Sequence, residues 1–230
     1  MRVLTGTSGF SYKEWKGSFY PEDLPADAML RYYGERLPAV EINNTFYRMP
    51  KAELLSGWAE QVSDGFRFVL KASQRITHFK RLKDVSEEVG YFLRVAATLG
   101  DRLGPILFQL PPNLKKDVPR LAAFLALLPP DHRAAFEFRN DTWFDDEVYA
   151  TLKGAGAALV LSEREDNAPP PLVETAPWGY VRLRLETYSD GDLRAWAQRL
   201  RNTGWQRVHA YFMHEPTAPA YAAALMAAAG

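Results

Sequence analysis

The sequence predicts an α/β fold, a single TIM-type (β/α)8 barrel that occupies residues 1–230 as one domain. Short apolar runs alternate with amphipathic segments about eight times along the chain, at the spacing expected of βα units. No Ser/Gly-rich linker or block of charge interrupts this alternation. An open, doubly wound sheet is the alternative, and we disfavour it because no glycine fingerprint follows the first strand.

Strands are expected to begin near Val3, Ala39, Phe66, Pro105, Arg133, Ala157, Gly179 and Arg207. Asp27 is expected to cap a first helix, and a second follows Pro50. Asp84 and Glu87 resemble a capping box that opens a third helix. Further helices are expected near 117–128, 144–154, 190–202 and 217–229, and the Pro-rich segment 167–171 is expected to be a loop.

Several strand-like runs alternate large apolar residues with charged ones, as in Phe136-Glu137-Phe138-Arg139. In a barrel the large apolar residues pack outward against helices, so their neighbours point into the barrel. The residues expected inside are Glu41, Asn43, Arg67, Lys71, Gln109, Glu137, Arg139, Ser162, Arg182, Arg184, His209 and Tyr211. Cations outnumber carboxylates in this set, and buried charges are costly unless they are paired or serve a ligand. This imbalance predicts an anionic ligand at the C-terminal mouth.

Composition limits the classes of function. The net charge is zero, so no global field draws the protein to nucleic acid or membrane. The chain has no cysteine, which excludes disulfides, thiolate metal sites and cysteine nucleophiles. The sequence shows neither a signal peptide nor an apolar stretch near the ~20 residues of a membrane span, so we expect a cytoplasmic protein without a membrane partner. The oligomeric state stays open.

Three residues are candidates for catalysis, namely Glu41, Glu137 and Lys71. Two carboxylates near one end of a barrel can divide the roles of acid and base if their environments separate their pKa values. The alternative is a buried network of ion pairs with Lys71, Arg139 and Arg182. Lys71 ends the third strand, where it can fix an anion, pair with Glu41 or form a Schiff base.

Other side chains are candidates for ligand binding. Arg139 and Arg182 offer planar forks for phosphate or carboxylate, while Asn43 and Gln109 would orient the bound molecule. The remaining candidates are His78, Tyr12, Trp15 and Tyr211. Tyr12 and Trp15 belong to an aromatic first loop that either stacks on a ligand or packs on itself across one end of the barrel. Of that loop, we expect these two rings to remain accessible.

Histidines are too few for a multinuclear zinc site, since the chain has only His78, His132, His209 and His214. No metal site or tightly bound cofactor is therefore expected, although weak magnesium binding through carboxylates stays open. The phosphate site common in barrels is not evident, because segments 186–189 and 213–216 lack glycine.

The loops resemble those of the YecE-like proteins, domain-of-unknown-function family 72. The resemblance rests on Gly6–Tyr12, Trp15–Gly17, Phe19–Pro21, Val40–Arg48, Ile76–His78, Leu107–Pro112, and Phe136–Arg139 followed by Trp143. It implies a TIM barrel and no settled activity. The chain departs from the family at Asn140, where relatives usually carry His, and at Met213–Pro216, where relatives tend to have an Asn-Asn-Asp-like segment.

Three hypotheses for function follow. The first is an enzyme that binds a small molecule bearing phosphate or carboxylate and uses paired carboxylates for acid–base or hydrolytic chemistry. The second is a protein that binds or processes nucleic acid, because Gly65–Lys83 holds several cations and no Asp or Glu. The third is a non-catalytic interaction or regulatory barrel, which the departures from the family pattern make credible.

Overall fold

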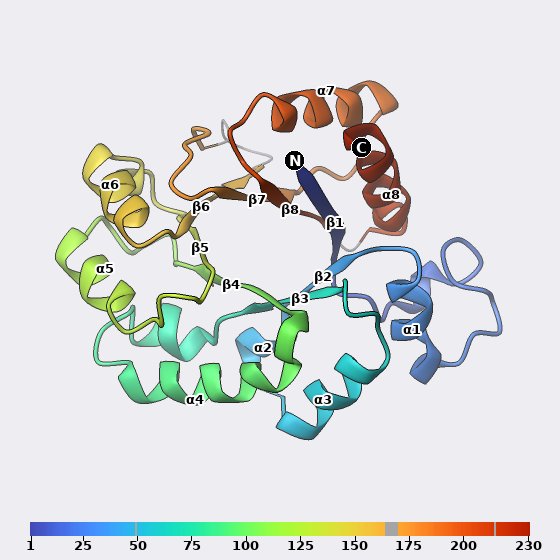
Figure 1. The fold of residues 1–230 in the computed structure, drawn as a ribbon, viewed down its shortest axis with the longest axis horizontal. Coiled ribbons are helices and arrows are strands. Elements are labelled where there is room, and N and C mark those ends of the chain that lie inside the picture. Colours follow the sequence, from blue (N-terminus) through green and yellow to red (C-terminus); the bar gives the residue numbers. More distant parts are fainter. Residues whose placement is uncertain (49, 164–169, 214) are drawn as a thin grey trace.

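The computed structural model describes residues 1–230 apart from 49, 164–169 and 214. Its strands form one closed barrel in which all neighbours are parallel and the strand order follows the chain (Figure 1). The strands are β1 (Arg2–Ser8), β2 (Ala39–Ile42), β3 (Arg67–Lys71), β4 (Leu103–Gln109), β5 (Ala134–Glu137), β6 (Ala158–Ser162), β7 (Trp178–Leu183) and β8 (Arg207–Phe212). The barrel prediction is confirmed, and each strand begins within two residues of the expected position.

Helices surround this ring on its outer side (Figure 1). They are α1 (Met29–Gly34), α2 (Asn44–Tyr47), α3 (Ala52–Glu60), α4 (Ser86–Ala96), α5 (Val118–Leu125), α6 (Asp146–Gly154), α7 (Asp190–Arg201) and α8 (Ala218–Ala229). Among the described residues between β6 and β7 there is no helix. Of the predicted 167–171 loop, residues 167–169 lie outside the described part of the chain.

The alternation of the strands sorts their side chains as predicted. Phe108 and Phe136 point outward from neighbouring strands, stack with ring centroids 5.2 Å apart, and both pack against Phe124 of α5. Burying a phenylalanine contributes about 1.5–3 kcal/mol, so these contacts fasten the helices to the barrel. The inward positions one residue away, among them Leu107 and Ala135, form a separate apolar cluster inside the ring. The polar side chains at the C-terminal ends of the strands lie next to this inner cluster.

Two predicted helix caps are wrong. Asp27 lies within a short turn, Ala26–Ala28, and α1 begins after it without a side-chain cap. Asp84 has a left-handed φ of +51°, and α4 begins at Ser86 without a side-chain cap. A capping box is present instead at α7, where Ser189 and Asp192 satisfy each other's backbone N–H groups. The caps predicted at Asp27 and Asp84 do not form because local turns lead the chain into α1 and α4.

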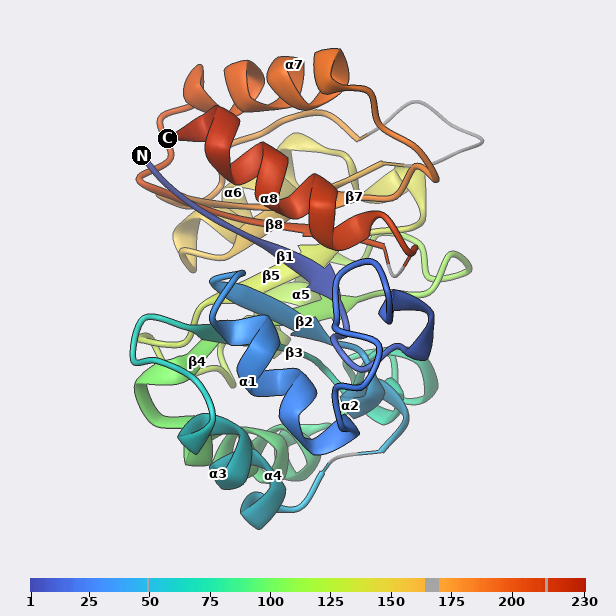
Figure 2. The same cartoon turned by 90° about the vertical axis from the view of Figure 1, so that its right-hand side faces the viewer.

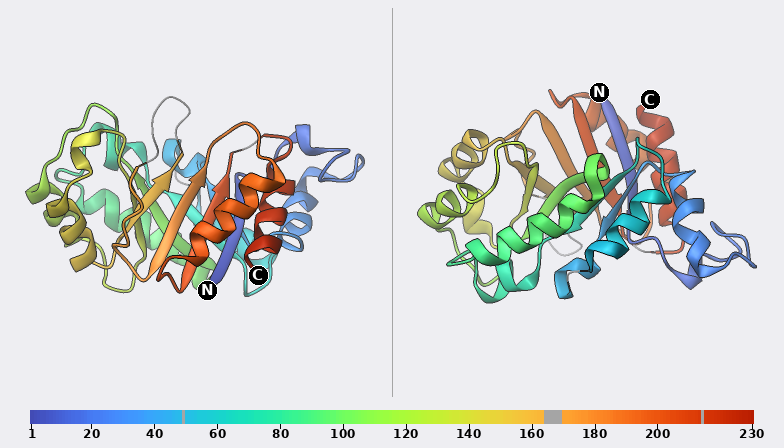
Figure 3. Two further views of the ribbon diagram at one scale, coloured as in Figure 1. Left: turned by 90° about the horizontal axis from the view of Figure 1, so that it is seen from above. Right: turned by 60° about the horizontal axis from the view of Figure 1, so that its bottom comes forward.

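The strands all run in one direction, from the end where the N-terminus lies (Figure 3, left). The loop that follows β1, residues 9–28, and the short helix α2 lie at the opposite end, where β1 finishes (Figure 2). The residues that follow each strand therefore lie at this end of the barrel, the C-terminal mouth. TIM-barrel enzymes have their active sites at this end. Within the described residues, no helix reaches the length and apolar character that crossing a bilayer requires.

Candidate site at the C-terminal mouth

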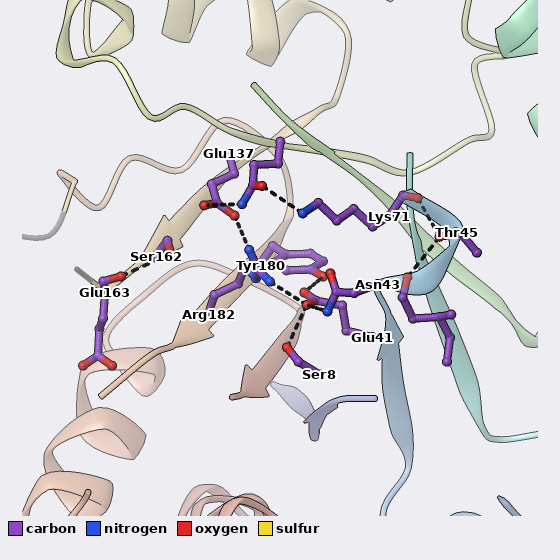
Figure 4. Close-up of polar contacts among 12 residues, drawn as sticks. Ser8, Glu41, Asn43, Thr45, Lys71, Glu137, Ser162, Glu163, Tyr180 and Arg182 are labelled. Carbon is purple, nitrogen blue, oxygen red and sulfur yellow. Dashed lines mark hydrogen bonds and ion pairs between the residues drawn. The ribbon is translucent and has the colours of Figure 1, made fainter. Parts of the chain in front are cut away.

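Polar side chains at the last inward positions of the strands converge at the C-terminal mouth (Figure 4). The strand register sets Ser8 beside Glu41 and Gln109 beside Glu137. Arg182 reaches this layer from β7, on the other side of the ring. Residues far apart in the chain thus meet because each ends a parallel strand of one closed barrel.

Arg182 joins the two glutamates at the centre of the site. Its Nη2 lies 2.8 Å from Oε1 of Glu41, and its Nη1 lies 2.5 Å from Oε2 of Glu137. The three residues are at most 4% exposed. Both carboxylates strongly raise the pKa of Arg182 against the opposing effect of burial, so its guanidinium stays charged. Attraction between the opposite charges holds these three buried side chains together. Removal of one of them would leave a buried charge without its partner, which is costly.

Both carboxylate oxygens of Glu41 accept hydrogen bonds, four in all. Oε1 accepts from Ser8 Oγ at 2.9 Å and from Asn43 Nδ2 at 2.9 Å, besides Arg182. Oε2 accepts from the hydroxyl of Tyr180 at 2.6 Å. Burial alone would raise the pKa of this carboxyl, but Arg182 and the hydrogen bonds bring it below the usual value. Glu41 is therefore ionised at neutral pH.

Glu137 is held in the same ionised state. Its Oε1 accepts from Gln109 Nε2 at 2.8 Å and from Arg139 Nε at 3.1 Å. Burial opposes ionisation, yet Arg182, Arg139 and Arg184 together lower the pKa of this carboxyl to about 2. The acid–base role that the sequence assigns to the two glutamates stays a prediction. Their ion pairs and hydrogen bonds favour the alternative, a network of buried ion pairs.

Lys71 stands at the edge of this network without an ion pair among the described residues. Its Nζ donates to the neutral Oε1 of Gln109 at 2.8 Å and lies 4.1 Å from the ring centre of Phe46. Burial and the nearby charge of Arg182 lower the pKa of this amine to about 8, despite the opposing effects of the glutamates. Gln109 therefore connects Lys71 to Glu137. The direct ion pair between Lys71 and Glu41, which was one alternative from the sequence, is not formed among the described residues.

Further cations lie beside Lys71 at the open side of the mouth. The side chain of Arg139 is 38% exposed, although its Nε binds Glu137. His78 hydrogen-bonds Thr77 Oγ1 through Nδ1 at 2.9 Å, and its pKa is lowered by burial and then by the charges of Lys71 and Arg139. Arg184 is half-buried, and its pKa is lowered by burial and then by Arg182. Among the described residues of the mouth, the cations Arg182, Lys71, Arg139 and Arg184 thus outnumber the carboxylates Glu41, Glu137 and the neighbouring Glu163.

A cleft of about 550 Å³ adjoins the network beside β2. Asn43 lines it, and the Oδ1 of this amide is buried without a hydrogen-bond partner among the described residues. Tyr12 also lines the cleft and donates from its hydroxyl to the carbonyl of Ser8 at 2.7 Å. Phe10 and Trp58 contribute an aromatic wall, with ring centroids 5.9 Å apart. The cleft therefore has room for an organic molecule whose polar end faces Asn43.

Two predicted ligand-binding residues are placed elsewhere. Trp15 is fully buried against Tyr12 and Tyr20, so the expectation that its ring stays accessible is wrong, and the first loop packs on itself around it. Tyr211 is 1% exposed and sits below the mouth beside Tyr180, with ring centroids 5.4 Å apart. Arg67, expected inside with the other cations, begins β3 and lies at the opposite end of the barrel.

Sequence reasoning missed two donors to Glu41, namely Tyr180 and Ser8. Tyr180 lies two residues before Arg182 on β7, so the face assigned to Arg182 includes it. Ser8 lacked an obvious partner in the sequence because its partner, Glu41, is 33 residues away. The strand period could have found Tyr180, whereas the pairing of Ser8 needed the register of β1 on β2.

Asn140, where the resemblance leads us to expect His in relatives, shapes the loop after β5. Its Nδ2 donates to the carbonyl of Pro112 at 2.8 Å, and its Oδ1 accepts from the N–H of Thr142 at 3.2 Å. The side chain is thus used by neighbouring loops. The second departure, Met213–Pro216, includes His214, which lies outside the described residues. In the part of the chain that is described, no three His, Asp or Glu residues form a group suited to a metal ion.

The model of the family described as "Protein of unknown function DUF72" matches residues 4–230. A curated relative, UPF0759 protein YecE of Escherichia coli K12, is 34% identical over 116 residues, which cover 50% of this chain and 43% of that protein. UPF0759 protein YunF of Bacillus subtilis is 29% identical over 140 residues, which cover 57% and 50%. The matched stretches thus span half or less of these relatives.

Solved structures share the fold. A DUF72 family protein from Thermotoga maritima superposes with a TM-score of 0.82 at 26% identity, covering 98% of this chain and 97% of that one. A DUF72 family protein from Enterococcus faecalis gives a TM-score of 0.77 at 21% identity, covering 98% and 96%. At that lower identity the likeness concerns the fold alone.

Proposed function

This chain belongs to the DUF72 family of unknown function, and from the geometry of its mouth we propose an enzyme that acts on a small anionic molecule. The molecule carries a phosphate or carboxylate, which Lys71 and Arg139 hold at the open side of the site. Lys71 also transfers a proton. The organic part of the bound molecule occupies the cleft between the first loop and α3.

One observation carries this proposal: Lys71 is partly buried, cationic and hydrogen-bonded to a neutral amide oxygen. Glu41 and Glu137 are already matched by arginine and by hydrogen-bond donors, so they do not neutralise the lysine fully. An anion placed beside Lys71 and Arg139 would supply the missing charge. Arg139 suits this role because its side chain is 38% exposed and, among the described residues, its contact with Glu137 uses Nε alone.

The lowered pKa of Lys71 supports a role in proton transfer. An amine with a pKa of about 8 is divided between its two protonation states near neutral pH, which is the condition for efficient acid–base catalysis. The glutamates, ionised at this pH, would then serve to fix Arg182 and to tune the lysine. A bound anion would raise the pKa of Lys71 again, which favours the protonated form when substrate binds.

Calorimetric titration with a panel of phosphates and carboxylates tests the anion site. We expect at least one compound to bind the wild type, and Arg139→Ala to weaken that binding by about tenfold, the effect of a charge-assisted hydrogen bond. Arg194→Ala, an exposed arginine on α7, is the matched control and should bind normally. If every compound acts on the wild type and on Arg139→Ala alike, the anion site does not exist.

The pH dependence of the same binding tests Lys71. Affinity should fall as the pH rises through about 8 in the wild type, because the lysine loses its charge. In Lys71→Gln the affinity should be weaker and should not change between pH 7 and pH 9. A wild-type affinity that is constant across this range would remove Lys71 from the site.

A second candidate function is binding of single-stranded nucleic acid, favoured by exposed rings beside basic residues at the same mouth. Tyr47 is 72% exposed and Phe79 is 70% exposed, and both can stack on bases. Arg75 and Lys80 lie in the same basic loop, but both form ion pairs with Glu88. Gel shift at two salt concentrations decides this candidate, since phosphate contacts require binding that weakens steeply with salt.

A further inference from the structure

Four arginines lie at the end of the barrel opposite the proposed active site. Arg2, Arg67 and Arg207 are the first residues of β1, β3 and β8, and Arg133 immediately precedes β5. The backbone carbonyl of Arg133 accepts from the N–H of Ile106 at 2.8 Å, so the ladder with β4 already includes this residue. All four therefore sit at the N-terminal mouth.

Their side chains share the inward face. Positions two residues further along the same strands, Leu4, Val69 and Ala135, belong to the apolar cluster inside the ring. Strand side chains alternate between faces, so Arg2, Arg67 and Arg133 also start on the inner side. Arg207 has the same relation to His209 and Tyr211, and the latter is part of that cluster.

The four side chains start from positions around the rim of the N-terminal mouth. Arg2 and Arg207 are direct neighbours in the register of β1 on β8. Nη2 of Arg2 leans past β2 and lies 3.9 Å from the position a Cβ would take on Gly65, close to the start of β3. Burial, followed by the charges of the other three arginines, lowers the pKa of Arg207. The four cations, which lie at the starts of four strands, therefore repel one another.

Nearby acids do not neutralise this group. Among the described residues, no ion pair is formed by any of the four arginines. Asp64 pairs with Arg102 at 2.7 Å, Asp131 lies 3.7 Å from His132, and Glu174 accepts from the N–H of Gly204. Asp101 acts on Arg67 from a distance, as one minor influence on its pKa. Like charges gathered in this way destabilise a fold unless something offsets them.

His209 adds an unsatisfied polar group beneath the arginines. It is fully buried one inward position beyond Arg207, and its Nδ1 lies 3.3 Å from the hydroxyl of Tyr211. Its Nε2 has no hydrogen-bond partner in the described part of the chain. Burial and then the four arginines lower the pKa of this imidazole to about 3, so it is neutral at physiological pH. A neutral imidazole can donate one hydrogen bond toward a ligand.

We propose that the N-terminal mouth is a second anion site, in which Arg2, Arg67, Arg133 and Arg207 bind a small multivalent anion bearing phosphate groups. Guanidinium forks from several strand starts at one end of the barrel can match the several oxygens of a pyrophosphate group, and Nη1 of Arg67 also donates to the backbone carbonyls of Asp64 and Phe66, each at 2.7 Å. The site is separate from the one at the C-terminal mouth, since the apolar interior of the barrel lies between them. It therefore regulates or stabilises the protein from the face that carries no catalytic residue.

Titration calorimetry with sodium pyrophosphate, with ADP as a second ligand, tests this site at constant ionic strength. We expect the wild type to bind pyrophosphate and the double variant Arg133→Gln/Arg207→Gln to bind at least tenfold more weakly. Arg194→Gln on α7 is the matched control and should leave this binding unchanged. The comparison is repeated in an Arg139→Ala background, so that pyrophosphate held at the C-terminal mouth does not contribute, and the double variant should show the same loss there. If ADP and pyrophosphate bind with equal affinity, the recognised group is the diphosphate. If ADP binds more tightly than pyrophosphate, the diphosphate comes from a nucleotide.

Unfolding of the free protein provides an independent readout. Without ligand, Arg133→Gln/Arg207→Gln should unfold at the same urea concentration as the wild type or a higher one, because repulsion among the arginines is relieved. Pyrophosphate should then shift the midpoint of the wild type and leave that of the variant in place. The proposal is overturned if pyrophosphate fails to bind the wild type, if the double variant binds it equally well, or if the variant without ligand is clearly less stable.

Discussion

Replacement of Arg182 by methionine tests whether the mouth is held together by buried charge. The substitution keeps an unbranched side chain, although a shorter one, and removes both ion pairs, to Glu41 at 2.8 Å and to Glu137 at 2.5 Å. Glu41 then remains buried without a cation, and Glu137 keeps only its ion pair with Arg139. The loss of one partner from a buried ion pair costs about 3–5 kcal/mol, and we expect this loss in the free energy of unfolding at pH 7.

The pH dependence of stability supplies a sharper criterion. In the wild type the folded pKa of Glu137 is about 2, below the unfolded value of ~4.3, so its stabilisation is complete above pH 4.3. It is lost as the pH falls from 4.3 through 2, and it amounts to roughly 3 kcal/mol because one pKa unit corresponds to about 1.4 kcal/mol. Without Arg182, burial raises the pKa of Glu41 above its unfolded value and the sign reverses for this carboxyl, while Arg139 and Arg184 still lower the pKa of Glu137. The variant should then gain stability relative to the wild type as the pH falls from 7 to 4.

Urea unfolding at pH 7, 5.5 and 4, followed by circular dichroism, measures both quantities. Arg194→Met on the surface of α7 is the matched control and should change the free energy of unfolding by less than about 0.5 kcal/mol. Addition of Glu41→Gln and Glu137→Gln to Arg182→Met should restore most of the lost stability, since no buried charge then remains. A loss below about 1 kcal/mol for Arg182→Met, or an unchanged pH dependence, would refute the argument.

Two further predictions concern single side chains. Acylation of Lys71 by a small amine reagent, followed by mass spectrometry across pH 6–11, should have a midpoint near pH 8, because burial and Arg182 lower its pKa. An ordinary exposed lysine has a midpoint near ~10.4. Asn140→Ala should lower the free energy of unfolding by about 1 kcal/mol, since the cap on Thr142 is lost, and Asn140→Asp should retain most of it.

Clear results would contradict these two predictions. A midpoint for Lys71 above pH 10 would mean that the amine is fully solvated in solution, and the proton-transfer role would fail with it. Equal stability of Asn140→Ala and the wild type in urea unfolding would mean that the amide does not hold the loop after β5.

The architecture and the faces of the strands were predictable from local patterns. Apolar and charged residues alternate with a period of two along Phe136–Arg139, and the structure places Phe136 against α5 and Glu137 in the mouth, as expected. The helix starts at Asp27 and Asp84 were not predictable in this way. There the chain enters the helix through turns whose dihedral angles, such as the φ of +51° at Asp84, no capping motif reveals.

The sequence by itself determined the barrel, the end at which its site is built, and the residue types that meet there, because strand period and βα spacing are local properties of the chain. Only the tertiary structure decided which partners those residues take. Arg182 binds both glutamates, Lys71 binds Gln109 and Trp15 is buried, because closure of the ring sets distances between residues as much as 141 positions apart. The same closure gathers four arginines at the opposite mouth, where each strand on its own shows a single ordinary surface cation.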